Sequence, residues 1–145
     1  IPLLLKISPD IKDNLISGIS EVAIKNDISA IILTNTTNGN RDNLVSDIKK
    51  EEGGLSGEPL QQISTNMIKK FYKQLSGKIP IIGVGGINSG KSAYEKIVAG
   101  ASLLQLYTGF VYKGPSVAKD IKKELIQILK SEGIKNIKDA VGKGI

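Results

Sequence analysis

Two glycine-bearing turns in the second half of the chain have the composition of a phosphate-binding site. Gly85–Gly90, GGINSG, follows the apolar run Ile81–Val84, and Tyr107–Gly109 follows the run Ser102–Leu106. Backbone N–H groups at strand ends and at a helix N-terminus are favourable partners for an anion, and glycine lets a ligand approach the bare backbone. One Gly-Gly pair more often makes only a tight turn, but two adjacent turns of this kind favour a phosphate site.

Two other segments place polar side chains within or after apolar runs. Lys6 interrupts the run Pro2–Ile7, and a lysine in a buried strand is costly unless it meets an anion or its ammonium reaches water at the strand end. Thr34–Thr37 follows the run Ser29–Leu33. Four consecutive hydrogen-bonding side chains there suit a small polar ligand, but they also suit an Asx or ST turn. The residue types alone leave both interpretations open for each segment.

Apolar periodicity predicts the elements that position these residues. The predicted strands are Pro2–Ile7, Ser29–Leu33, Ile81–Val84 and Ser102–Leu106. The predicted helices cover residues 15–23, 60–75, 93–98 and 117–129, with short helical turns at 110–112 and 137–141. Strands that alternate with helices predict an α/β fold with a parallel sheet, and the polar segment 38–52 predicts a long surface loop.

Three residues mark where predicted helices begin. Ser89 is a suitable N-cap for the helix that holds Ala93 and Ile97. Pro59 suits the first turn of the helix over residues 60–75, and Pro115 is expected to open the last helix, because proline is tolerated at the first helical position.

The composition argues against several classes of chemistry. The 145 residues contain no Cys and no His, so we predict no disulfide, no thiolate nucleophile and no metal site. The net charge of +6 comes almost wholly from lysine, and with Arg41 as the only arginine and few aromatic residues it disfavours nucleic-acid binding. No apolar run approaches the ~20 residues of a membrane-spanning helix, so membrane attachment is expected to be peripheral or to lie outside this segment.

The chain is too short for a complete (β/α)8 barrel, which takes ~250 residues. It also begins at Ile1 rather than at a methionine. We therefore expect it to be the C-terminal half of a longer protein. In a barrel of this kind, phosphate sites commonly lie in the loops after strands 7 and 8, near a short extra helix. The two glycine-bearing turns and the segment 110–112 match that description.

Five motifs resemble one enzyme family. Three of them are IIGVGGINSG, AGASLLQLYTGFVYKGP and, upstream, GGLSGEPL, and they are joined to KISPD and LTNTT nearer the start of the chain. Together they resemble the dihydroorotate dehydrogenases, specifically the quinone-dependent class 2 form, from Lys6 to about Gly142. The resemblance implies that residues 1–145 are a partial FMN-binding domain, the C-terminal half (strands 5 to 8) of a parallel (β/α)8 TIM barrel.

The resemblance also implies roles for individual residues. Toward FMN it implies Lys6, Thr34, Gly57, Gly86, Tyr107 and Thr108, and toward the pyrimidine substrate it implies Asn35 and Thr36. Gly86 and Thr108 would act through their backbone N–H groups, with the Thr108 hydroxyl as an additional donor, and Tyr107 would act through its backbone with its ring packed. The general base, a serine in class 2 enzymes, would lie in the other half of the protein, so no catalytic residue is expected here.

The activity implied by the resemblance is the oxidation of dihydroorotate to orotate in UMP biosynthesis, with FMN as cofactor and a quinone as electron acceptor. Peripheral membrane association would come from the N-terminal region, at a bacterial cytoplasmic or mitochondrial inner membrane. One alternative is the class 1 form, with fumarate or NAD as acceptor and a cysteine base. Others are a phosphate-binding barrel without flavin, such as a sugar-phosphate isomerase or synthase, and a non-catalytic binding module.

Overall fold

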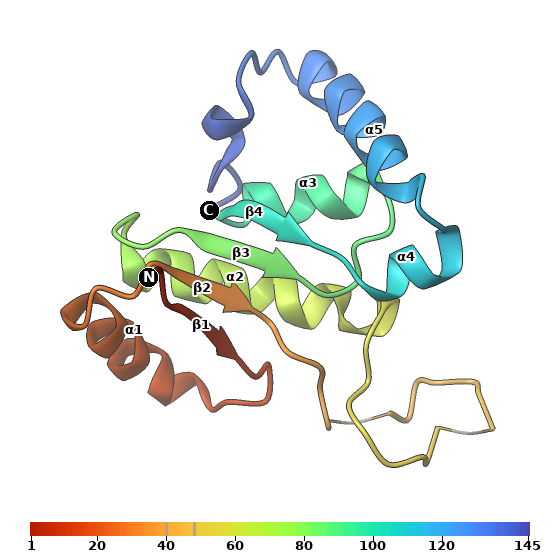
Figure 1. Ribbon diagram of the computed structural model, residues 1–145, viewed down its shortest axis with the longest axis horizontal. Helices are drawn as coiled ribbons and strands as arrows, with labels where there is room; N and C mark the ends of the chain where they lie inside the picture. Colours follow the sequence, from red (N-terminus) through yellow and green to blue (C-terminus); the bar gives the residue numbers. More distant parts are fainter. Residues whose placement is uncertain (40, 48) are drawn as a thin grey trace.

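The computed structural model describes residues 1–39, 41–47 and 49–145, and its centre is one parallel sheet (Figure 1). The sheet contains β1 (Leu4–Ile7), β2 (Ala30–Leu33), β3 (Ile81–Val84) and β4 (Ala101–Gln105), in that spatial order. Each neighbouring pair is parallel. All four strands therefore end at the same edge of the sheet, and the segments that carry the predicted site begin at that edge.

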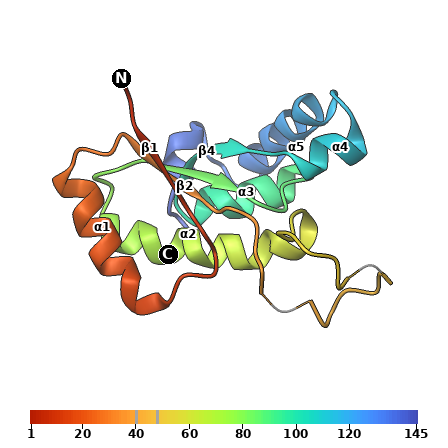
Figure 2. The ribbon, with the colours of Figure 1, turned by 60° about the horizontal axis from the view of Figure 1, so that its bottom comes forward.

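Helices connect the strands, because parallel neighbours require a crossover connection. The helical elements are η1 (Asp13–Leu15), α1 (Ile16–Lys25), η2 (Glu58–Leu60), α2 (Gln61–Leu75), α3 (Gly90–Val98), α4 (Thr108–Lys113), α5 (Val117–Ser131) and η3 (Ile137–Ala140). Figure 2 shows α1, α2 and α3 together on one side of the strands, and α5 packs against α3. The predicted α/β class and the alternation of strands and helices are confirmed.

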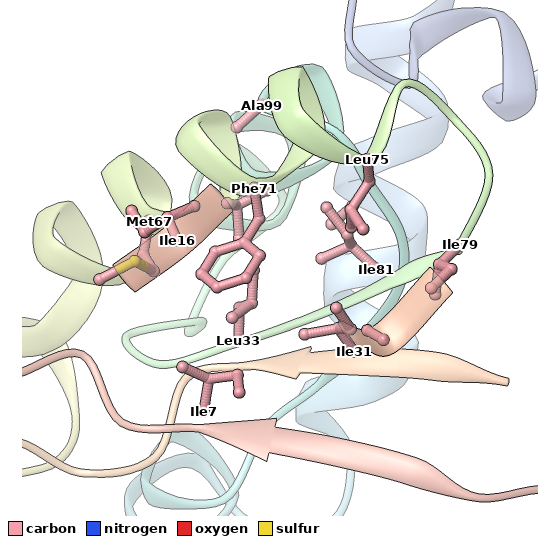
Figure 3. Packing of buried hydrophobic residues seen from close by; sticks show 13 residues of the cluster. Ile7, Ile16, Ile31, Leu33, Met67, Phe71, Leu75, Ile79, Ile81 and Ala99 are labelled. Atoms are coloured by element: carbon pink, nitrogen blue, oxygen red, sulfur yellow. The ribbon is translucent and has the colours of Figure 1, made fainter. Parts of the chain in front are cut away.

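Apolar side chains fill the space between α2 and the sheet (Figure 3). Ile31 and Leu33 of β2 and Ile81 of β3 form one cluster with Phe71 and Leu75 of α2, and none of the five is more than 1% exposed. Burying an apolar side chain of this size contributes about 1.5–3 kcal/mol. The cluster holds α2 firmly against β2 and β3, behind the strand ends.

A second cluster joins the other two long helices. Ala93 and Ile97 of α3 pack with Ile121 and Leu125 of α5, and Ile87 from the turn after β3 completes the group. Because these positions recur at helical spacing on both helices, α3 and α5 each bury one face and expose the other. The turn after β3 is thereby fixed to the helical layer by its own apolar residue.

The opposite face of the sheet is left uncovered by α1, α2 and α3. Lys6, Ile32 and Ile82 occupy paired positions in β1, β2 and β3, and Leu103 of β4 pairs with Ile82. Lys6 is exposed and Leu103 is 61% exposed, whereas Ile82 on the central strand is buried. Successive residues Ile81 and Ile82 of β3 are thus both buried, so this central strand is covered on both faces more fully than the edge strands are.

The strand predicted at Ile81–Val84 is confirmed as β3, whereas the other three predicted strands differ from the observed ones by one or two residues. The first strand begins at Leu4 rather than Pro2, because Leu4 is the residue that pairs with Ala30 of β2. The last strand runs one residue earlier than predicted, because Ala101 pairs with Ile81. Strand ends are set by where a partner strand lies, and an apolar run alone does not contain that information.

Two helix starts also differ from prediction. Thr108, predicted to lie in a turn, is the first residue of α4, because the backbone N–H groups of Phe110 and Val111 already donate to the carbonyl of Tyr107, at 2.9 and 3.1 Å. α4 is therefore longer than the short turn predicted at 110–112. Pro115 does not open the last helix, since α5 begins two residues later.

The predicted surface loop 38–52 includes residues 40 and 48, which lie outside the described residues. Over 41–47 and 49–52 the chain forms no helix or strand. The two ends of the loop are joined by an antiparallel bridge in which Thr37 and Leu55 exchange both backbone hydrogen bonds, at 3.1 and 2.8 Å. This bridge returns the chain to the strand ends before α2 begins.

Candidate functional site

A cavity of about 910 Å³ lies at the carboxyl ends of the strands. It is lined by Lys6 of β1, by the segments that follow β2, β3 and β4, and by the segment that precedes α2. All eight residues singled out from the sequence line it: Lys6, Thr34, Asn35, Thr36, Gly57, Gly86, Tyr107 and Thr108. The fold thus brings together five segments that are spread over a hundred residues of sequence.

The segment after β2 is held across three strands. The backbone N–H of Thr34 donates to the Val84 carbonyl at 3.1 Å, and that of Asn35 donates to the Ile7 carbonyl at 2.8 Å. Thr34 is 2% exposed, yet its hydroxyl has no hydrogen-bond partner among the described residues. Asn35 and Thr36 have exposed side chains. The backbone here is fixed while the polar side chains that line the cavity keep their hydrogen-bonding capacity.

Thr37 is structural, although it belongs to the same polar segment. Its hydroxyl donates to one carboxylate oxygen of Asp10, and the other oxygen accepts from the backbone N–H of Asn38 at 2.8 Å. The Thr37 hydroxyl in turn accepts from the Gly39 N–H at 2.9 Å. For this residue the ST-turn interpretation is therefore the better one. Sequence reasoning missed Asp10, whose only signal was an acidic residue in the turn after a strand.

The glycine-rich segment before α2 packs on the end of β4. The Ser56 and Thr108 hydroxyls are 2.8 Å apart, and Gly57 has a φ of 81°. A Cβ atom at Gly57 would lie 3.0 Å from the methyl carbon of Thr108. Either hydroxyl can be the donor of this bond, so the predicted roles of the Thr108 hydroxyl and of its backbone N–H toward a ligand both stay predictions.

The two glycine-bearing turns predicted to form one site lie in contact. A Cβ at Gly109 would lie 2.4 Å from the carbonyl oxygen of Ile87, and the Lys113 ammonium donates to the Asn88 carbonyl at 2.8 Å. Gly86 has a φ of 72°, and a Cβ there would lie 2.6 Å from the Cα of Gln61. Only glycine fits at Gly86, because both the backbone conformation and the neighbouring main chain exclude a side chain.

The N-terminus of α3 is capped from within the chain. Ser89 is its N-cap, as predicted, and it forms a capping box with Ser92: each hydroxyl accepts from the other residue's N–H, at 3.2 and 3.0 Å. The carboxylate of Glu124 accepts from the Gly90 N–H. These N–H groups already have acceptors, so an anion in the cavity would bind to the turns rather than to the end of α3.

Two aromatic residues at the cavity are exposed rather than packed. Tyr107 is 79% exposed and Tyr112 is 85% exposed. The expected packing of the Tyr107 ring is therefore not found among the described residues. Lys6 is exposed as well, and in β1 it lies on the uncovered face of the sheet.

A buried lysine lies behind the cavity, and sequence reasoning missed it. Lys96 of α3 is 0% exposed, and its ammonium contacts polar groups of α2. Burial lowers the pKa of Lys96 from its ordinary value of 10.5 to about 8, with Glu95 acting in the opposite direction. A lysine in an amphipathic helix is usually solvated, so the only available signal was its position between Ala93 and Ile97 on the apolar face.

Sequence comparison identifies relatives over nearly the whole chain. The family model for dihydroorotate dehydrogenase matches residues 1–129. A mitochondrial dihydroorotate dehydrogenase (quinone) of Arabidopsis thaliana is 46% identical over 142 residues, which cover 97% of this chain and 31% of that protein. A dihydroorotate dehydrogenase (quinone) of Vibrio cholerae is 52% identical over 127 residues, which cover 86% of this chain and 37% of that protein.

Structural comparison agrees with the sequence. A crystal structure of DHODH from Eimeria tenella in complex with ferulenol matches with a TM-score of 0.94 and 43% identity, and covers 98% of this chain and 38% of that one. The chain spans only 31% of the length of the Arabidopsis relative and 40% of that of a relative from Natronomonas pharaonis. With a family model that matches residues 1–129 and relatives of up to 52% identity, the chain belongs to the dihydroorotate dehydrogenase family.

Proposed function

We propose that this chain is the C-terminal half, strands 5 to 8, of an FMN-binding (β/α)8 barrel, with residues 1–145 forming part of that one domain. Three observations support the proposal. The four strands are parallel and follow one another in sequence order, one face of the sheet lacks helices from α1 to α3, and Leu103 on that face is 61% exposed. A barrel closes such edges with further strands and buries such a face in its interior.

The residues that line the cavity fit the flavin nucleotide. The observation that carries the proposal is that all eight predicted residues, from five separate segments, line one cavity at the strand ends. Gly57, Gly86 and Thr108 present backbone to it, so a phosphate can approach the main chain. The unpartnered hydroxyl of Thr34 is a buried polar group that a ligand would satisfy. Tyr107 contributes its backbone at the same end.

The chemistry of the proposed reaction divides between the cofactor and this chain. Bound FMN would supply acceptance of a hydride from dihydroorotate and delivery of the electrons to a quinone. The ammonium of Lys6 favours negative charge that develops beside it, because it lies at the cavity with no partner among the described residues. Asn35 and Thr36 orient the substrate, since an amide side chain both donates and accepts. The general base belongs to the rest of the protein.

The whole protein would therefore oxidise dihydroorotate to orotate for UMP biosynthesis. As a quinone-dependent enzyme it would associate peripherally with a bacterial cytoplasmic or mitochondrial inner membrane through a region outside this chain. In the described residues, no helix combines the length and the apolar character needed to cross a bilayer. This chain alone is proposed to be inactive, because it lacks the base.

An absorbance spectrum of the purified full-length protein tests the flavin, and dihydroorotate tests the reaction. We expect flavin bands, bleaching of those bands when dihydroorotate is added without oxygen, and recovery when a soluble quinone is added. Recovery with fumarate or NAD but not with quinone would identify the class 1 alternative. A protein without flavin bands that also fails to bind added FMN would overturn the proposal.

A further inference from the structure

The ammonium of Lys96 has three hydrogen-bond partners, all on α2. It donates to the Gln61 carbonyl at 3.2 Å, to the Ser64 hydroxyl at 3.2 Å and to the Thr65 hydroxyl at 3.0 Å. Lys96 and Ser64 are 0% exposed, and Thr65 is 6% exposed. All three partners are neutral. A buried charge is tolerated only when its hydrogen-bonding capacity is used, and here three acceptors match the three protons of the ammonium.

The direction of the neighbouring hydrogen bonds requires a donor at this position. The Thr65 hydroxyl donates to the Gln61 carbonyl at 2.8 Å, and the Ser64 hydroxyl donates to the Val84 carbonyl at 2.5 Å. Each hydroxyl has one proton, so each can only accept from Lys96. An apolar side chain in place of Lys96 would leave these lone pairs without a donor.

The network reaches the cavity through the end of β3. The Val84 carbonyl accepts from Ser64 and also from the backbone N–H of Thr34, at 3.1 Å. The turn that follows lies directly on α2: a Cβ at Gly85 would lie 3.2 Å from the Cβ of Ser64, and one at Gly86 would lie 2.8 Å from the backbone nitrogen of Gln61. Lys96 therefore holds the part of α2 on which this turn rests.

We propose that Lys96 is a positioning residue for the cofactor phosphate: acting through Ser64 and Gln61 from behind the sheet, it fixes the Gly85–Gly86 turn in the geometry that binds the anion. This inference rests on the proposed function, because it assigns the phosphate of FMN to the turn. Lys96 touches no ligand itself. A lysine that served only to join α2 and α3 would affect stability alone, so the two roles are separable by experiment.

The test compares two flavins that differ in the phosphate. Full-length protein stripped of flavin is titrated with FMN and with riboflavin, and dissociation constants are measured by flavin fluorescence. We expect Ser64→Ala and Lys96→Met to raise the dissociation constant for FMN about tenfold, equivalent to one lost hydrogen bond to a charged group, and to leave that for riboflavin unchanged. Lys91→Met, an exposed lysine on the same helix, is the matched control and should change neither constant.

Other results decide against the inference. If both variants weaken FMN and riboflavin by the same factor, or weaken neither, Lys96 is only a packing residue and the inference is overturned. Ser64→Ala removes the hydroxyl that joins Lys96 to the Val84 carbonyl and keeps the charge of Lys96, so it decides the question should Lys96→Met fail to fold. A wild-type protein that binds neither flavin overturns the proposed function itself, whereas binding without a loss of FMN preference in the variants overturns the inference alone.

Discussion

Two lysines, Lys6 of β1 and Lys96 of α3, lie on opposite sides of the sheet, and their environments are opposite. Lys6 lies on the uncovered face, is exposed and has no hydrogen-bond partner among the described residues. Lys96 lies behind the helix-covered face and is 0% exposed. Its ammonium donates three hydrogen bonds, one for each proton. One ammonium is left for an external anion, and the other is satisfied by the fold.

The same contrast extends to the neighbouring polar groups. On the cavity side the Thr34 hydroxyl is buried without a partner, and Asn35 has an exposed side chain. On the helix side the hydroxyls of Ser64 and Thr65 are bonded to both donors and acceptors. Native proteins leave few buried polar groups unpaired, so the side with unpaired groups is the one that a ligand would complete.

The largest effect is expected at Gly86, where the turn on the cavity side contacts α2 on the helix side. In Gly86→Ala the new Cβ would lie 2.6 Å from the Cα of Gln61, at a φ of 72°. Strain and overpacking together should destabilise the full-length protein by about 2–5 kcal/mol and abolish tight FMN binding. Gly77→Ala is the matched control, since Gly77 has a φ of 76° but no atom within 4 Å of the added Cβ. It should cost about 1 kcal/mol, and equal losses of melting temperature in the two variants would contradict a steric role for the turn.

The next effect concerns the helix side and depends on pH. Because burial lowers the pKa of Lys96 from 10.5 to about 8, the unfolded chain binds more protons than the folded one between these values. The destabilisation due to the buried charge is therefore complete below pH 8 and is relieved as the pH rises toward 10.5. The 2.5-unit difference corresponds to about 3 kcal/mol. The melting temperature of flavin-free protein should rise over this interval by the corresponding amount.

The comparison with Lys96→Met isolates this contribution from other groups. Burial and, to a lesser extent, Glu132 raise the pKa of Tyr94 above 10.0, which lowers stability as the pH passes 10. Tyr94 is present in both proteins, so the difference in melting temperature between wild type and Lys96→Met cancels its effect. That difference should grow in favour of wild type between pH 8 and 10. A constant difference would mean that Lys96 has an ordinary pKa in the folded protein.

On the cavity side, Lys6→Ala should slow reduction of the bound flavin by dihydroorotate. Loss of a hydrogen bond to a charged group, worth ~1.5–3 kcal/mol, corresponds to a rate decrease on the order of 10- to 100-fold. Stopped-flow absorbance of the full-length enzyme measures the rate. Lys25→Ala, an exposed lysine at the end of α1, is the control. An unchanged rate in Lys6→Ala would remove the proposed role of this ammonium.

The smallest effect is expected at Thr34, whose backbone N–H donates to the same Val84 carbonyl as the Ser64 hydroxyl. Thr34→Val removes a buried hydroxyl that has no partner among the described residues, so the melting temperature of flavin-free protein should stay the same or rise. FMN affinity should fall about fivefold, equivalent to about 1 kcal/mol. Ser20→Ala removes the other unpartnered buried hydroxyl among the described residues, in α1, and should leave FMN affinity unchanged. Equal affinities in both variants would exclude Thr34 as a flavin contact.

Most of the architecture could be predicted from local sequence. The runs that became β2 and β3 and the N-cap Ser89 were placed to within one residue, because apolar runs and capping residues leave local signals. The eight residues that line the cavity were named from the family resemblance, and their roles toward FMN and substrate stay predictions. Two signals disagreed about the start of α5: the apolar pattern placed it at Val117, where it begins, whereas Pro115 placed it two residues too early. The roles of Asp10 and Lys96 were missed because each acts on a segment more than twenty residues away.

The sequence by itself determined the alternation of strands and helices, the absence of cysteine and histidine chemistry, and the residue types offered at each strand end. Only the tertiary structure decided which of those polar groups are already paired. A serine, a threonine or a lysine has the same hydrogen-bonding capacity wherever it occurs, but whether that capacity is used depends on which helix packs behind which strand. In the described part of the chain, that packing leaves the Lys6 ammonium and the Thr34 hydroxyl without partners and gives the Lys96 ammonium three.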